Sequence, residues 1–314
     1  NKSLVTQTEE DYRNCGLDVG VYFGDRKELN KTHTICTWQS LNILDKKNKN
    51  GEEALSLAQF LDGVHTVIVD EAHSLKADVL RKLLTQNIKN APVRWGLTGT
   101  IPKEDFEKQS LIACIGPVVG KVSARELQDK GIISNCHINI IQTRDVQVFK
   151  NYQEELKFLV TDDKRIEYMA KMINNMRQNG NTMVLVDRIT AGEKLQELVP
   201  GSVFVKGNVK LNDRKAAYDD INTGENQVLI ATYGVAAVGI NIPKLFNVVL
   251  VEPGKSFVRV IQSIGRGIRK AKGKDFVQIW DISSTCKFSK RHLSKRKSYY
   301  AEVEYPYTIQ KVDY

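Results

Sequence analysis

Apolar and polar positions follow two recurring patterns along the chain. Short apolar runs rich in β-branched residues are typical of buried strands, whereas apolar residues spaced three and four positions apart predict helices. Strand-like runs comprise residues 18–23, 33–37, 65–69, 94–97, 136–143, 182–186, 203–205, 227–231, 247–251 and 276–280. Helix-like stretches comprise residues 54–61, 77–84, 165–179, 191–198, 211–222 and 257–267, and the opening 16 residues also read as helix.

The alternation of strands and helices predicts an α/β fold with parallel sheets covered by helices. Residues 66–69 and 248–251 are apolar at nearly every position, which indicates strands buried on both faces. The alternation pauses at residues 144–150, where we place a linker between two domains, residues 1–145 and 146–314. Residues 45–53 are expected to form a mobile polar loop, and residues 289–300 a basic helix.

The composition excludes several classes of protein. With 41% hydrophobic and 26% charged residues, the chain has a composition typical of neither disordered nor membrane proteins. No apolar run approaches the roughly 18 residues of a membrane-spanning helix, and no signal peptide is recognisable. The five cysteines are scattered without a CxxC pair, which argues against a disulfide framework or zinc site and favours a reducing, intracellular setting.

The net charge of +9 is unevenly distributed. Residues 255–314 contain 14 Lys and Arg against five Asp and Glu, so 14 minus 5 accounts for the whole surplus. A basic surface of this kind indicates a polyanionic partner, of which nucleic acid is the commonest. A solvated basic surface without a partner is the alternative that charge alone leaves open.

The segment VIVDEAH, Val67–His73, places two carboxylates directly after a buried strand. Ligands of open α/β sheets bind at this edge of the sheet. Asp70 and Glu71 could there divide two tasks, one holding Mg²⁺ and the other orienting a water for attack on a γ-phosphate. The simpler alternative is a strand that runs into a helix whose first turn favours acidic side chains.

Further polar segments follow strands in a regular order. They are TWQS at 37–40, GLTGT at 96–100, VLIATYGVAAVGINIP at 228–243 and QSIGRGIRK at 262–270. Arg266 and Arg269 are three positions apart, which places both on one face of a helix. Two guanidinium groups at this spacing could stabilise a transferring phosphoryl group, and a basic helix end is the alternative.

Together these segments resemble motifs II, III, V and VI of the superfamily 2 helicases. Within that superfamily, the sequence is most similar to the UvsW helicases of T-even bacteriophages and their phage relatives. The resemblance implies two RecA-like domains that meet at a cleft, with ATP and Mg²⁺ as cofactors. It also implies an ATP-dependent DNA helicase or translocase that acts on branched DNA, in fork regression, D-loop or Holliday-junction branch migration. The setting would be the cytoplasm of a phage-infected bacterium, with no membrane partner and a monomer favoured.

The resemblance also assigns roles to individual residues. It implies that Asp70 and Glu71 bind Mg²⁺ and activate water, and that His73 links the nucleotide state to the rest of the protein. The remaining catalytic residues would be Gln262, Arg266 and Arg269, and those for ATP binding or coupling Thr98, Gly99, Thr100, Gly239 and Asn241. Asn241 stands where an Asp is common, which weakens its expected ribose contact. Contacts to DNA would come from Thr37, Trp38, Gln39, Thr232, Gly207 and Arg214. Trp38 could stack on a base or pack in the core, and the aromatic residues among the cations of residues 287–300 leave the same choice.

A helicase of this kind requires a phosphate-binding loop of the form G-x-x-x-x-G-K-[ST]. Residues 1–314 contain no such sequence. We therefore expect that the natural protein has preceding residues, that the first domain is truncated at its N-terminal end, and that the chain alone hydrolyses ATP poorly. An ATPase-inactive nucleic-acid-binding module, the translocase part of a restriction enzyme, and an RNA substrate remain alternatives.

Overall fold

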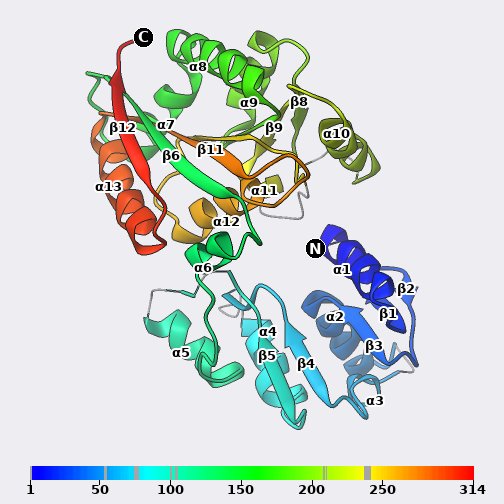
Figure 1. The fold of residues 1–314 in the computed structure, drawn as a ribbon. Helices are drawn as coiled ribbons and strands as arrows, with labels where there is room; N and C mark the ends of the chain where they lie inside the picture. The colour runs from blue at the N-terminus through cyan, green and yellow to red at the C-terminus, as the bar shows by residue number, and fades with distance from the viewer. Residues whose placement is uncertain are drawn as a thin grey trace. The chain divides into compact units, whose positions relative to one another are not determined.

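The computed structural model describes residues 2–52, 55–73, 78–99, 101–102, 105–207, 209, 211–236 and 242–314. The chain forms two compact units, Asn1–Lys121 and Val122–Tyr314 (Figure 1).

The first unit contains two small sheets. In one, β1 (Val19–Phe23) is parallel to β3 (His33–Cys36) and antiparallel to β2 (Arg26–Lys27). In the other, β4 (Thr66–Val69) is parallel to β5 (Val93–Gly96). The described helices of this unit are α1 (Lys2–Asn14), α2 (Trp38–Lys49), α3 (Leu57–Phe60), α4 (Asp78–Lys82), the π-helical turn η2 (Leu83–Asn87) and α5 (Asp105–Cys114).

Strand β4 is buried on one face only, so the expectation of burial on both faces is wrong for this strand. Val67 and Val69 pack against a cluster that includes Ala72, Leu84 and Leu111. On the opposite face, Ile68 and its cross-strand neighbour Trp95 are 50% and 48% exposed. Within the described residues, helices cover only the face of Val67 and Val69. This explains why β4 is not buried on both faces as expected.

The expected mobile loop at residues 45–53 is also partly wrong, because α2 continues to Lys49. Lys49 Nζ lies 2.5 Å from Asp45 Oδ2, an ion pair at helical i, i+4 spacing that stabilises this last turn. Gly51, with φ of 72°, follows the helix end.

The second unit is built on a seven-stranded sheet in the order β12-β6-β11-β10-β7-β9-β8. All neighbouring strands are parallel, as the alternation of strands and helices predicted. The strands are β6 (Asn135–Thr143), β7 (Thr182–Val186), β8 (Val203–Val205), β9 (Val228–Thr232), β10 (Asn247–Val251), β11 (Phe276–Ser284) and β12 (Tyr307–Val312).

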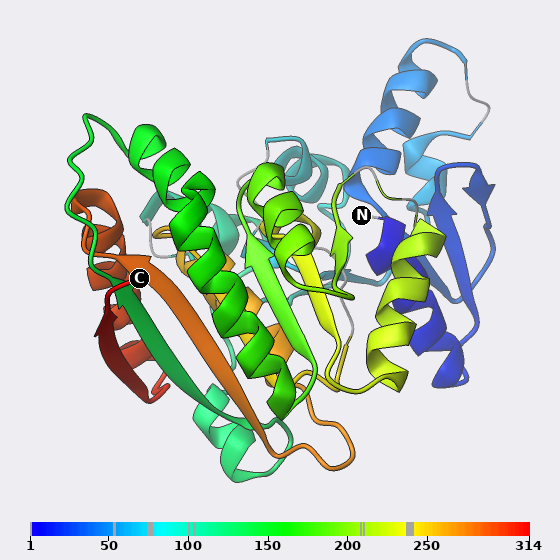
Figure 2. The ribbon, with the colours of Figure 1, turned by 90° about the horizontal axis from the view of Figure 1, so that it is seen from above.

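Helices cover both faces of this sheet (Figure 2). One face carries α7 (Tyr152–Thr161), α8 (Asp163–Met176) and α9 (Ile189–Leu198), with the short η3 (Arg177–Asn179) after α8. The other carries α10 (Leu211–Thr223), α11 (Tyr233–Ala236), α12 (Phe257–Gly267) and α13 (Lys287–Glu302), and α6 (Ala124–Asp129) precedes the sheet.

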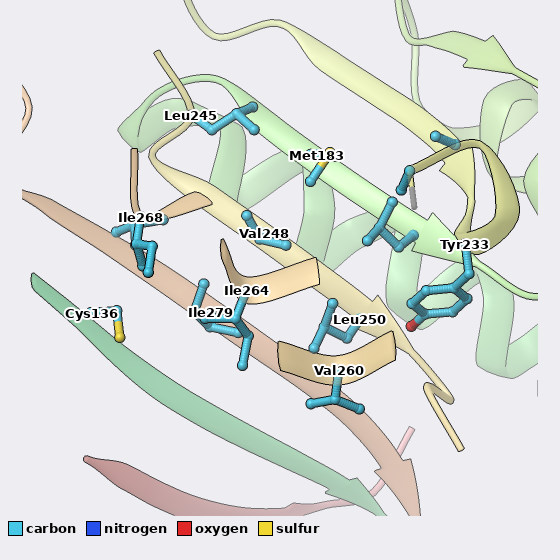
Figure 3. Close-up of a cluster of buried hydrophobic side chains, with 14 of the residues drawn as sticks. Cys136, Met183, Tyr233, Leu245, Val248, Leu250, Val260, Ile264, Ile268 and Ile279 are labelled. Carbon is cyan, nitrogen blue, oxygen red and sulfur yellow. The ribbon is translucent and has the colours of Figure 1, made fainter. Parts of the chain in front are cut away.

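Strand β10 shows why the second sheet is so apolar. Val248 and Leu250 point into the cluster drawn in Figure 3, whereas Val249 and Val251 pack against the helices of the other face. All four side chains are at most 1% exposed. The expected burial of this strand on both faces is therefore confirmed.

Strand β6 belongs to the second unit, so the units divide earlier than the boundary that we expected at residue 145. It pairs with β11 and β12, which lie at the C-terminal end of the chain. A local apolar pattern locates such a strand but does not identify its partners, which is why the boundary was misplaced. The expected linker, residues 144–150, is the irregular segment between β6 and α7. No helix among the described residues is long and apolar enough to cross a membrane.

Candidate active site

The acidic turn after β4 folds back onto the end of β5. The Leu97 amide donates to the Val69 carbonyl, and the Ala72 amide donates to the Leu97 carbonyl, both at 2.9 Å. A Cβ atom on Gly96 would lie 2.7 Å from Ile115 Cδ1 and 3.2 Å from Ala72 Cβ, so any larger residue here would force Ile115 to move and would crowd Ala72. Within this turn Glu71 adopts φ of 52°, a conformation that is uncommon for non-glycine residues and is enriched at functional sites.

His73 connects the acidic turn to the GLTGT segment. Its Nδ1 atom lies 3.1 Å from Thr98 Oγ1 and 3.2 Å from Glu71 Oε2, so a protonated Nδ1 could donate to either. The Asp70 carboxylate accepts the Glu71 amide at 2.9 Å and is otherwise exposed. The structure thus brings Asp70, Glu71, His73 and Thr98 together, and it leaves Gly99 exposed beside them.

The TWQS segment forms the start of α2. Thr37 is buried and caps this helix, since its Oγ1 accepts the Ser40 amide at 3.2 Å. Trp38 is half-buried and packs against the cluster of Tyr22, Leu41 and Leu44. Of the three side chains expected to contact DNA here, only that of Gln39 is exposed.

In the second unit, the residues expected to contact DNA lie on three elements. Arg214 of α10 donates to the carbonyls of Gly207, at 2.6 Å, and Val209, at 2.9 Å. This side chain therefore orders the turn that contains the exposed Gly207. Thr232 is the last residue of β9 and is half-buried, at the same sheet edge as the end of β10.

Arg269 does not lie on the same helix as Arg266, so the expected pair on one helix face is not formed. Helix α12 ends at Gly267, and Arg269 forms an antiparallel bridge with Ile133. Gly267 is packed against β10, where an added Cβ would meet Val248 Cγ2 at 2.6 Å. The next residues pair instead with the segment before β6, since the Ser134 amide donates to the Ile268 carbonyl at 2.7 Å.

Lys274 is a buried residue beside the predicted Arg269 that the sequence did not reveal. Its side chain is buried, and its ammonium group donates to the carbonyls of Pro243, Gly267 and Arg269. Burial lowers the pKa of this ammonium group to about 8. Lys274 thereby ties the end of the VLIATYGVAAVGINIP segment to the end of α12 and to the Arg269 backbone.

We expect Lys274→Met to lower the free energy of unfolding of the second unit by about 2–3 kcal/mol, because three buried carbonyls lose their donor. Urea unfolding followed by Trp280 fluorescence, with Trp38 and Trp95 replaced by Phe, would measure this effect. The exposed Lys272 two positions away supplies the control, and Lys272→Met should change stability by less than about 0.5 kcal/mol. Equal losses in the two variants would contradict the role of Lys274.

The turn that leads from β10 into α12 is held by side chains from three helices, α8, α11 and α13. The Tyr233 hydroxyl donates to the Val251 carbonyl at 3.2 Å, and Arg165 Nη2 lies 2.8 Å from the buried Glu252 carboxylate. From α13, Arg296 Nη1 donates to the Gly254 carbonyl at 2.6 Å, and the Tyr299 hydroxyl to the Lys255 carbonyl at 3.0 Å. These contacts fix the position at which α12 begins.

Some predicted residues lie outside this description. Thr100, Gly239 and Asn241 are outside the described residues, and Gln262 and Arg266 are placed on α12 by their backbone only. The other predicted residues fall in two groups, one in each unit. The first group surrounds the ends of β3, β4 and β5, and the second lies near the ends of β8 and β9 and after α12.

Two family models match the chain, one in each half. Residues 1–103 match the model described as "Type III restriction enzyme, res subunit". Residues 164–271 match the model described as "Helicase conserved C-terminal domain".

Individual relatives agree with these matches. The ATP-dependent DNA helicase uvsW of Enterobacteria phage T4 is 25% identical over 241 residues, covering 73% of this chain and 48% of that protein. The DNA 3'-5' helicase XPB of Mycobacterium tuberculosis is 24% identical over 308 residues, covering 94% of this chain and 53% of that protein. The chain thus spans about half the length of these curated relatives.

Among solved structures, Dbp5 of S. cerevisiae bound to RNA and ADP BeF3 superimposes with a TM-score of 0.64. The match covers 99% of this chain and 75% of Dbp5 at 16% identity. This likeness supports the fold: two RecA-like α/β units, as the sequence resemblance implied.

Proposed function

We propose that this relative of the superfamily 2 DNA helicases is the motor of a DNA-dependent ATPase that translocates along DNA. The observation that carries the proposal is the contact between the acidic turn and the GLTGT segment, where His73 Nδ1 lies within 3.2 Å of both Glu71 and Thr98. A change at the Glu71 carboxylate can reach the Thr98 loop through this one imidazole. Coupling of this kind is what a motor needs and what a passive DNA-binding protein does not.

The residues present fit part of a nucleotide site. Asp70 and Glu71 offer carboxylate oxygens, which Mg²⁺ prefers, and Mg²⁺ in such sites is usually held by one or two carboxylates together with substrate phosphates. When bound, Mg²⁺ would neutralise charge on the phosphates of ATP.

The roles of the protein groups follow from their placement. Asp70 would hold the metal ion, and Glu71 would accept a hydrogen bond from the attacking water and orient it. The left-handed backbone conformation of Glu71 places its carboxylate beside His73. His73 would in turn transmit a change at that carboxylate to Thr98. Arg266 and Arg269 would stabilise charge on the phosphates, with Lys274 holding the Arg269 backbone. Gln262 would assist from the same helix as Arg266.

The substrate is proposed to be branched DNA, such as a fork, a D-loop or a Holliday junction, in a phage-infected bacterium. The similarity to the phage T4 helicase supports this narrower proposal. Gln39, exposed at the start of α2, and the Gly207 turn ordered by Arg214 would contact the DNA backbone. Thr37 and Trp38 would act indirectly, because one caps α2 and the other packs beneath it.

ATP hydrolysis measured with and without a four-way DNA junction, alongside the intact mass of the sample, tests the proposal. We expect junction-stimulated turnover from the natural full-length protein and little turnover from residues 1–314 alone, which contain no G-x-x-x-x-G-K-[ST] sequence. Absence of stimulated turnover in the full-length protein would contradict the proposed function. A junction bound without any hydrolysis would instead identify an ATPase-inactive binding module.

A second candidate is the translocase part of a restriction enzyme, which the family match of residues 1–103 favours. DNA cleavage dependent on ATP in the full-length protein would support that candidate. Stimulation by single-stranded RNA equal to that by DNA would indicate an RNA substrate.

A further inference from the structure

The second unit has a groove that the proposed motor does not use. It has a volume of about 600 Å³ and lies between the segment after β6 and the first turns of α13. Val146 and Val148 line it from the segment, and Lys287, Lys290 and Arg291 line it from the helix. In Figure 1 both elements lie at the edge of the sheet formed by β12 and β6.

The apolar part of the groove is held in place although it is exposed. Val146 and Val148 are each 90% exposed. The Asp145 amide donates to Thr285 Oγ1 at 2.9 Å, and Cys286 Sγ donates to the Gln147 carbonyl at 3.5 Å. The segment is therefore fastened to the residues that begin α13. The two β-branched side chains thus form a small exposed apolar patch beside the groove, which a binding partner could cover.

The basic part of the groove is a single face of α13. Lys287, Lys290 and Arg291 are spaced i, i+3 and i+4, and all three are exposed. None of them forms an ion pair with any residue in the described part of the chain. The opposite face of α13 is buried and consists of Ser289, Leu293, Arg296 and Tyr300.

Other polar groups around the groove already have partners, so the three cations are the groups that could bind an anion. The backbone amides of Phe288 and Ser289 already donate to the Glu155 carboxylate, at 3.0 and 2.6 Å. The Asp145 carboxylate accepts hydroxyl groups from Thr143, Ser284 and Tyr314. Burial, together with the cations Arg296, Lys255, Arg291 and Lys295, lowers the pKa of His292 to about 4, in keeping with a positive potential along this helix.

We propose that this groove binds an extended acidic segment of a partner protein, in which carboxylates alternate with apolar side chains. Side chains of an extended peptide point alternately to opposite sides, so one side could contact Val146 and Val148 while the other reaches the cations. The two valines share the same i, i+2 spacing. A nucleic-acid backbone would satisfy the cations but would leave both valines against hydrated phosphates, which favours a peptide.

The test uses a fluorescein-labelled peptide of four Asp-Leu repeats and the full chain. Fluorescence anisotropy should show saturable binding, whereas a peptide of four Asp-Ser repeats and one of four Lys-Leu repeats should bind at least about tenfold more weakly. The first comparison removes the apolar groups and the second reverses the charge. Equal binding of the Asp-Leu and Asp-Ser peptides would overturn the proposal.

Paired variants locate the site. Lys290→Glu with Arg291→Glu, and separately Val146→Ser with Val148→Ser, should each weaken the Asp-Leu peptide about tenfold or more. The matched control is Lys272→Glu with Lys295→Glu, which changes the same charge at exposed positions outside the groove and should have little effect. An equal loss in the control pair would indicate nonspecific attraction.

A four-way DNA junction serves as the competing ligand. If it loses affinity in both groove variants and the Asp-Leu peptide does not bind the original chain, the groove is a nucleic-acid surface and the proposal is wrong. None of these measurements requires ATP hydrolysis, so their outcome is independent of the proposed motor function.

Discussion

Glu71→Gln is expected to lower DNA-stimulated ATP hydrolysis of the natural full-length protein by about 10²–10⁴-fold. The amide keeps the size of the side chain but removes the negative charge that would orient the attacking water. The residue also stays within reach of His73, which lies 3.2 Å from the carboxylate. Phosphate release at saturating DNA, measured beside the affinity for a four-way junction, tests this expectation.

The control is Glu10→Gln, which makes the same change at an exposed position of α1. It should leave both turnover and affinity within about twofold of the original protein. If Glu71→Gln retained more than about a tenth of the turnover, Glu71 could not be the water-orienting group. A parallel loss of DNA affinity would point to a structural role instead.

Arg296→Ala is expected to lower the free energy of unfolding of the second unit by about 3–5 kcal/mol, because it leaves a buried carboxylate without its counterion. Arg296 and Asp281 are both fully buried and form two hydrogen bonds of 2.8 Å. The Gly254 carbonyl would also lose its donor. Urea unfolding followed by Trp280 fluorescence, in the background with Phe at positions 38 and 95, measures the loss.

Two further variants separate charge from packing. The exposed neighbour Lys295 provides the control, and Lys295→Ala should change stability by less than about 0.5 kcal/mol. Removing both charges, in Arg296→Met with Asp281→Leu, should recover much of the loss, since the unpaired buried charge is then gone. A double variant as unstable as Arg296→Ala would show that packing, not charge, sets the effect.

Local signals were sufficient to predict most of the strands and the turn at the end of β4. The residues of β7, β8 and β10 were predicted to the residue, because apolar β-branched runs bounded by polar residues depend only on neighbours in sequence. The carboxylates of Asp70 and Glu71 were found because they follow such a run. The contact of His73 with Thr98 was not predicted from local signals, because it requires β4 and β5 to lie side by side.

The residues that were not predicted have roles that depend on partners far away in the sequence, or on which face of a helix they occupy. Strand β12 was not predicted, because half of its six residues are polar, four of them are exposed, and it is held in the sheet by pairing with β6. Arg296 stands in a run of cations, and only the helical spacing of Ser289, Leu293, Arg296 and Tyr300 separates the buried residues from the exposed ones. Lys274 gave no signal, since three backbone carbonyls surround it only in the folded unit.

The position of β6 has a consequence for the order in which the protein forms on the ribosome. The hydrogen bond from Asn139 to the Ile279 carbonyl joins residues 140 positions apart, and the other edge of β6 pairs with β12 near the end of the chain. The first unit can fold during synthesis, but β6 is without both neighbours until β11 and β12 emerge. Because such distant pairings form slowly, the second unit is exposed to aggregation until β11 and β12 have been made. Slower synthesis should therefore change the amount of soluble first unit little. Protein made without β12, by contrast, should accumulate in the insoluble fraction.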